Sequence, residues 1–143
     1  MKLRPHHLFC VQGFQGKGYA DDYTDNLQRI ADAVAANPRL EVDVVDGPDD
    51  VCARCPYLED GVCHWEEAGE EAVRAHDAAL LAVLGLRDGQ VTSIDEVRHR
   101  FRGEPAVAAE VRRQCSTCAW LKDCAFMGSQ SSINVPTSPQ TRR

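Results

Sequence analysis

The stretch GEEAVRAHDAALLAVL, residues 69–84, predicts an amphipathic helix that anchors the fold. Its apolar residues recur at helical spacing and share one inward face: Val73, Leu80, Val83 and Leu84. His76 falls on the same stripe and is expected to be a packed core or edge residue. Gly85 follows directly and is typical of a helix C-terminus. The fold therefore begins from a helix with one buried side.

Three further helices follow from the same reasoning. Asp21 or Asp22 is expected to cap a helix that ends at Asn37-Pro38. Its apolar stripe runs along one face: Tyr23, Leu27, Ile30 and Val34. Ser93 and Glu96 form a capping box for the next helix. Pro105 begins the last helix, which is expected to reach about residue 114.

The remaining segments add a short helix and little strand. A short helix is expected after Pro5, to about Val11, before a glycine-rich turn. Residues 40–45 alternate like a strand, and Val91 adds a second brief one. The predicted fold class is mainly α, with minor strand content, in one small domain over residues 1–127. Residues 128–143 are poor in apolar side chains, and this tail is expected to be disordered.

Composition excludes several classes of protein. The chain has 143 residues and 43% hydrophobic content, which suffices for a globular core. Its formal net charge of −6 disfavours nucleic-acid binding and anionic membrane surfaces. No apolar run is long enough for a membrane-spanning helix, and no secretory h-region follows the first charged residues. A cytoplasmic protein is expected.

The seven cysteines point to metal chemistry. In a reducing cytosol they are not expected to pair as disulfides. Six fall in two clusters, Cys52-x2-Cys55-x7-Cys63 and Cys115-x2-Cys118-x5-Cys124. A two-residue spacing lets a tight knuckle direct both sulfurs at one metal. Two such clusters indicate metal or iron–sulfur binding more strongly than one.

Spacing alone does not decide which ligands share a site. Four ligands are usual, and each cluster supplies three. Cys10 is the seventh sulfur and can complete the first cluster, which leaves the second in need of a histidine or with an open iron position. Joining the two CxxC pairs in one site is another arrangement. A single cluster held by four of the seven cysteines is a third.

Histidines offer alternative ligands. His6 and His7 lie beside Cys10, but adjacent helical residues diverge, so at most one of them can bind, and His7 is retained as a candidate metal ligand. His64 follows Cys63 directly and competes with it for the same place. Zinc and iron–sulfur clusters both suit thiolate ligands. A thiol–disulfide oxidoreductase is disfavoured because neither CxxC opens a helix in a βαβ context.

The chain resembles a known family. The ordered series consists of Arg4-Pro5-His6-His7-x2-Cys10, Gly13-Phe14-x-Gly16-x-Gly18-Tyr19, Asp50-x-Cys52-x2-Cys55-Pro56 with Cys63, and Cys115-x2-Cys118-x-Trp120 with Cys124. It is similar to the bacterial and archaeal domain-of-unknown-function family 1284 over residues 2 to about 127. That resemblance implies iron–sulfur binding without supplying a reaction.

The resulting hypothesis is a small protein holding an iron–sulfur cluster, of the four-iron kind, for electron transfer or redox sensing. Cys52, Cys55 and Cys63 are the expected ligands, with Cys10 as the fourth. Cys115, Cys118 and Cys124 belong to the same or a second site. A redox protein is the expected partner. A structural Zn²⁺ protein acting as a binding module is the alternative.

No catalytic motif stands out, and the sequence predicts no oligomeric state. Asp49-Asp50 is read as a pair of solvated loop charges.

Overall fold

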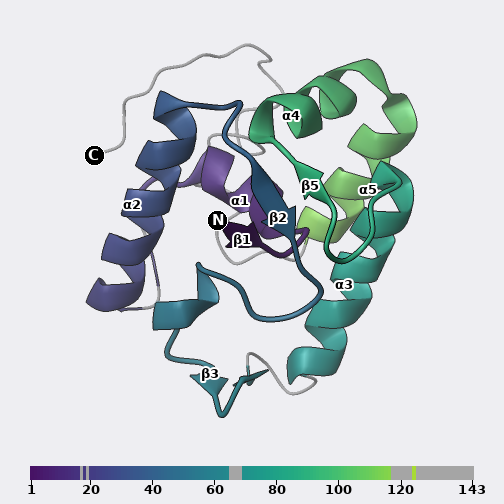
Figure 1. The fold of residues 1–143 in the computed structure, drawn as a ribbon. Coiled ribbons are helices and arrows are strands. Elements are labelled where there is room, and N and C mark those ends of the chain that lie inside the picture. Colours follow the sequence, from purple (N-terminus) through teal and green to yellow (C-terminus); the bar gives the residue numbers. More distant parts are fainter. Residues whose placement is uncertain (17, 19, 65–68, 117–123, 125–143) are drawn as a thin grey trace.

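A computed structural model describes residues 1–16, 18, 20–64, 69–116 and 124 (Figure 1). The helices are α1 (His7–Gly13), α2 (Asp21–Ala36), the 3-10 turn η1 (Cys52–Arg54), α3 (Gly69–Leu84), α4 (Ile94–Gly103) and α5 (Pro105–Cys115). The strands are β1 (Lys2–Leu3), β2 (Val42–Val44), β3 (Leu58–Glu59), β4 (Val62–Cys63) and β5 (Val91–Thr92). The predicted fold class, mainly α with minor strand content, is confirmed.

A small mixed sheet lies at the centre. Its strand order is β1-β2-β5, with β1 parallel and β5 antiparallel to β2. Leu3 lies opposite Val44, and both are fully buried, as is Val42. The alternation expected over residues 40–45 therefore directs valines into the core, although the strand itself is shorter.

Helices cover this sheet from two sides. In Figure 1, α2 stands on one side, α3 and α5 stand on the other, and α4 lies above them. Helix α1 packs on α2, and α5 packs on both α3 and α4. The separate hairpin β3–β4 lies at the lower end of the molecule, beyond η1. This arrangement leaves η1 and its loop between the N-terminal segment and α2.

Most helix boundaries agree with the sequence. Helix α3 spans the expected residues 69–84. The Ser93 hydroxyl accepts a hydrogen bond from the Glu96 backbone N–H at 3.1 Å, which confirms the predicted cap. The expected cap of α2 is wrong, because Ala20 occupies that position without a side-chain bond. Asp21 and Asp22 instead lie in the first turn, where their negative charge interacts favourably with the positive end of the helix dipole.

The buried face of α3 includes one residue that the apolar pattern left out. His76 is half-buried, and its Nδ1 hydrogen-bonds the Gln114 amide oxygen of α5, which fits the packed edge residue that was expected. Asp77 is fully buried, although it is charged. It lies four residues after Val73 and three before Leu80, so the buried stripe carries a carboxylate. A buried carboxylate requires partners, which the N-terminal segment supplies.

Some predictions fall on residues outside the described part of the chain. The residues concerned are Cys118, Trp120 and the tail 128–143. Within the described part, none of the helices is both long and apolar enough to cross a membrane.

Candidate functional site

A buried carboxylate, Asp49, organises the loop that precedes η1. Its side chain has no exposed surface. One oxygen, Oδ1, accepts hydrogen bonds from the backbone N–H groups of Val51 at 2.9 Å and Cys52 at 3.0 Å. The other, Oδ2, accepts from the Arg4 backbone N–H at 2.6 Å and lies 2.7 Å from His7 Nδ1. The expectation of a solvated loop charge is therefore wrong for Asp49, because the loop needs this acceptor for its own N–H groups.

These partners keep Asp49 ionised. Burial alone would raise the pKa of the Asp49 carboxyl. The charge and hydrogen bond of His7, together with the backbone N–H groups of Arg4 and Cys52, outweigh that effect and hold the pKa well below its usual range. With four partners on two oxygens, Asp49 serves as an acceptor of hydrogen bonds.

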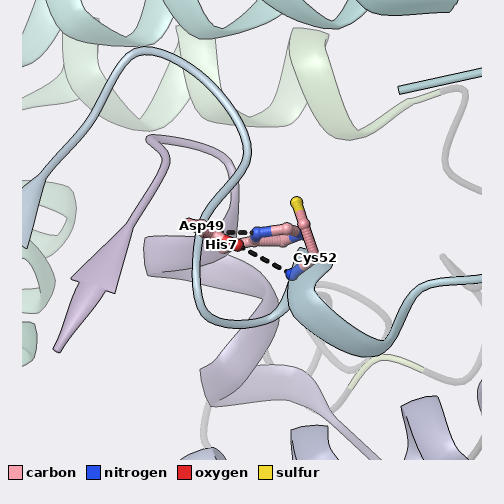
Figure 2. Close-up of side chains that lie close together, drawn as sticks. All are labelled: His7, Asp49 and Cys52. Carbon is pink, nitrogen blue, oxygen red and sulfur yellow. Dashed lines mark hydrogen bonds and ion pairs between the residues drawn. The ribbon is translucent and has the colours of Figure 1, made fainter. Parts of the chain in front are cut away.

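His7 lies between that carboxylate and a cysteine. The imidazole comes from the first turn of α1 and is buried, with 9% of its side chain exposed. Figure 2 shows the ring between Asp49 on one side and the Cys52 side chain on the other. Potential ligand atoms of these three residues all lie within 4.8 Å of one another. That separation is in the range for ligands of a single metal ion.

Cys52 begins η1 and is buried. Burial and the neighbouring Asp49 carboxylate raise the pKa of its thiol to about 12. The positive charge of the Arg4 guanidinium opposes this effect in part. A free thiolate nucleophile is therefore not stabilised here, whereas a bound cation would favour the thiolate.

Cys55 and Cys63 lie on the knuckle that follows. Burial raises the pKa of the Cys55 thiol, and the nearby backbone N–H groups of Tyr57 and Leu58 oppose this in part. The Leu58 N–H itself donates to the Cys55 carbonyl oxygen at 3.1 Å. The β3–β4 hairpin places Cys63 opposite Leu58 and brings its thiol into electrostatic contact with Cys55. The hairpin turn is Asp60-Gly61, and both residues have positive φ, as a type I′ turn requires. The turn thus folds the third cysteine back toward the first two.

A second buried cluster ties this loop to α3. Arg4 has 1% of its side chain exposed, and its Nε donates to Asp77 Oδ2 at 2.7 Å. The other Asp77 oxygen accepts the His6 backbone N–H at 2.9 Å and lies 2.8 Å from His6 Nδ1. Arg4 also reaches Glu70 at 3.3 Å, and Glu70 accepts the Cys63 backbone N–H at 3.0 Å. One arginine therefore ties the N-terminal segment to helix α3, and its charge acts on the Cys52 thiol.

The other candidate ligands lie on other elements than the group formed by His7, Asp49 and Cys52 or are exposed, apart from Cys10, which shares α1 with His7. Cys10 is half-buried and lies one helical turn after His7 on α1. Cys115 ends α5, and both Cys115 and Cys124 pack against the core. His64 is exposed, 3.8 Å from Glu59. Among the residues described, the one group of three ligand atoms within single-ion distance is His7, Asp49 and Cys52.

Sequence reasoning missed Arg4, Asp49 and Asp77 as members of this centre. Asp77 carried a signal, since it lies on the apolar stripe of its helix. Asp49 carried another, because an aspartate side chain can accept hydrogen bonds from the backbone N–H groups two and three residues later. For Arg4, no periodicity distinguishes a buried guanidinium from an exposed one.

The fold and the site define a small, mainly α, cysteine-rich domain with a buried His–Asp–Cys group. The chain belongs to the family described as "Protein of unknown function (DUF1284)", whose model matches residues 18–124. The match includes six of the seven cysteines and begins after Arg4, His7 and Cys10. No curated protein and no solved structure matches the chain.

Proposed function

We propose that the first cysteine cluster holds an iron–sulfur cluster and that the protein serves in one-electron transfer or redox sensing. The observation that supports this most is the knuckle formed by η1 and the β3–β4 hairpin. It carries Cys52, Cys55 and Cys63 on a continuous stretch, with the backbone N–H groups of Tyr57 and Leu58 near enough to the Cys55 thiol to favour its thiolate. Such N–H groups stabilise metal-bound thiolates and tune cluster potentials.

The surrounding residues fit an iron–sulfur group. Cys52 is buried, and the Arg4 guanidinium beside its sulfur supplies a positive charge. Positive charge near thiolates offsets the net negative charge of an iron–sulfur centre. Cys10 is the fourth ligand that the sequence favours, and His7, one turn before it on α1, is the other candidate. Cys115, Cys118 and Cys124 would supply the same or a second site.

When bound, the cluster would accept or give up one electron. The protein's own residues would hold it, limit its contact with water and set its charge environment. Glu70 supports the hairpin through the Cys63 backbone N–H, so Arg4 and the knuckle are linked by one carboxylate. A redox protein is the proposed partner, because a one-electron carrier needs a donor and an acceptor.

A structural zinc site is the second candidate function. The observation in its favour is the His7–Asp49 pair, since metal-bound histidines commonly donate their second N–H to a carboxylate. Three thiolates and one imidazole form a common zinc site. In this case the metal would contribute folding free energy, and the surface would bind partners.

Anaerobic purification tests both candidates. We expect brown protein with iron and acid-labile sulfide, and we expect Cys55→Ser to lose most of both. Val62→Ser is the matched control, because Val62 lies on the same hairpin, exposed and without a ligand atom. Stoichiometric zinc without sulfide would replace the first proposal with the second. Equal metal content in Cys55→Ser and Val62→Ser would contradict both.

A further inference from the structure

We infer that His7, rather than Cys10, completes the metal centre of the first cysteine cluster, through its Nε2 atom and on the same metal ion as Cys52. This inference rests on the proposed function, which places a metal at Cys52, Cys55 and Cys63. It changes the expected donor set from four sulfurs to three sulfurs and one nitrogen. Asp49 then acts as the positioning residue of the imidazole and is not itself a ligand.

Asp49 sets the tautomer of His7. Asp49 Oδ2 lies 2.7 Å from Nδ1 and also accepts the Arg4 backbone N–H. An ionised carboxylate only accepts hydrogen bonds, so Nδ1 must carry the proton. With that proton on Nδ1, the imidazole can bind a metal only through the lone pair of Nε2.

The Nε2 atom of His7 lies in a buried side chain and has no hydrogen-bond partner among the described residues. The His7 side chain is 9% exposed, and no described residue hydrogen-bonds its Nε2. Buried polar atoms are nearly always paired, so this nitrogen needs a partner from outside the described residues. Figure 2 places the Cys52 side chain beside the end of the ring away from Asp49. A metal ion bound to that sulfur would lie where the nitrogen needs a partner.

Asp49 is not expected to bind the metal itself. Its three backbone hydrogen bonds hold the loop that carries Cys52. Metal ligation would take at least one of these acceptor sites and leave a buried N–H unpaired. The proximity of His7, Asp49 and Cys52 therefore describes two ligands and the carboxylate that orients one of them.

Charge supports nitrogen over a fourth sulfur. Asp49 and Asp77 are both buried, and Arg4 is the one buried guanidinium among the described residues. A fourth thiolate would add another negative charge to this region, whereas a neutral imidazole adds none. In a two-iron cluster each iron takes two protein ligands, so His7 and Cys52 could share one iron. A single zinc ion could instead take all three thiolates and the imidazole. The inference thus applies to either metal.

Pulsed electron-nuclear double resonance on the dithionite-reduced, anaerobically purified protein tests the ligand directly. We expect a strongly coupled nitrogen whose signal changes when the protein is labelled with 15N-histidine. A protein with full iron and sulfide content and no such coupling would overturn the inference while leaving the proposed function intact. Absence of any bound metal would contradict both the inference and the proposed function.

Variants separate the two candidate ligands. We expect His7→Gln to lose most of the metal, and Cys10→Ala and His6→Gln to keep it. If the protein carries zinc, the same comparison is made on zinc content. Loss of metal in Cys10→Ala would contradict the inference even if His7→Gln fails to fold. Asp49→Asn tests positioning and should weaken metal affinity roughly 10- to 100-fold, as for other carboxylates behind metal-bound histidines.

Discussion

Two neighbouring histidines each contact a buried aspartate, but the two pairs differ in their surroundings. His7 faces Asp49, whose other partners are backbone N–H groups of the loop before η1. His6 faces Asp77, whose other side-chain partner is Arg4. The His6 side chain is 31% exposed and the His7 side chain 9%. The same chemical pair therefore occurs once at the cysteine knuckle and once at helix α3.

The two aspartates therefore have different roles: Asp49 orients groups at the site, and Asp77 anchors the N-terminal segment to α3. Asp49 fixes a loop and an imidazole beside Cys52, so its effect is on the geometry of the site. Asp77 joins the N-terminal segment to α3 through an ion pair, so its effect is on stability. Replacing members of each pair should therefore change different measurements.

Removal of the Arg4 guanidinium should have the largest effect on stability. Arg4→Met leaves Asp77 buried without its cation, and we expect a loss of about 3–5 kcal/mol in the free energy of unfolding. Urea unfolding followed by circular dichroism measures this. The double variant Arg4→Met/Asp77→Leu is the control and should recover much of the loss, because both charges are removed. A loss below about 1 kcal/mol in Arg4→Met would contradict the anchoring role.

Acid should weaken the same anchor. Burial would raise the pKa of Asp77, but His6 and Arg4 outweigh it and lower this pKa to about 2. A depressed carboxyl pKa gives stability that is present above the unfolded-state pKa of about 4 and lost as pH falls to about 2. The contribution is on the order of 2 kcal/mol.

This pH dependence is measured by urea unfolding at a series of pH values from neutral to strongly acid. Asp49 contributes with the same sign, since its pKa is also lowered. The comparison that isolates Asp77 is therefore with Asp77→Asn, whose stability should fall less steeply on acidification. Parallel curves for the two proteins would show that Asp77 does not contribute.

Loss of the His6 ring should have the smallest effect. In His6→Gln, Asp77 keeps Arg4 Nε and the backbone N–H of residue 6, so we expect a loss of about 1 kcal/mol. Metal content should be unchanged, in contrast to His7→Gln. Urea unfolding and metal analysis of both variants measure this. A metal loss in His6→Gln equal to that in His7→Gln would show that the two pairs are not distinct.

Periodic patterns predicted the scaffold well. The apolar spacing of α3 and the Ser93 cap of α4 are local properties, and both were found where expected. The spacing of Cys52, Cys55 and Cys63 is also local, so the sequence singles them out as candidate ligands, which stays a prediction. These features depend on contacts within a few residues, which a sequence displays directly.

The charged centre could not be predicted in the same way. Asp49 and Asp50 are identical neighbours in sequence, yet one is buried and the other exposed. The difference depends on Arg4 and His7, which lie more than 40 residues earlier. No local pattern records which carboxylate meets a distant backbone N–H, and burial of Arg4 depends equally on Asp77, 73 residues away.

Arg4 contacts residues far along the chain, and this affects the order in which the chain can fold. During synthesis Arg4 leaves the ribosome well before Asp49, and Asp77 follows later still. The parallel pairing of β1 with β2 and the ion pair to α3 must both wait for these later residues. Contacts of such high sequence separation slow folding. Strand β1 can therefore pair only once β2 has been made, and the Arg4 side chain has no Asp77 to pair with until α3 follows. The N-terminal segment is thus the part of the protein that a nascent-chain chaperone would have most time to meet.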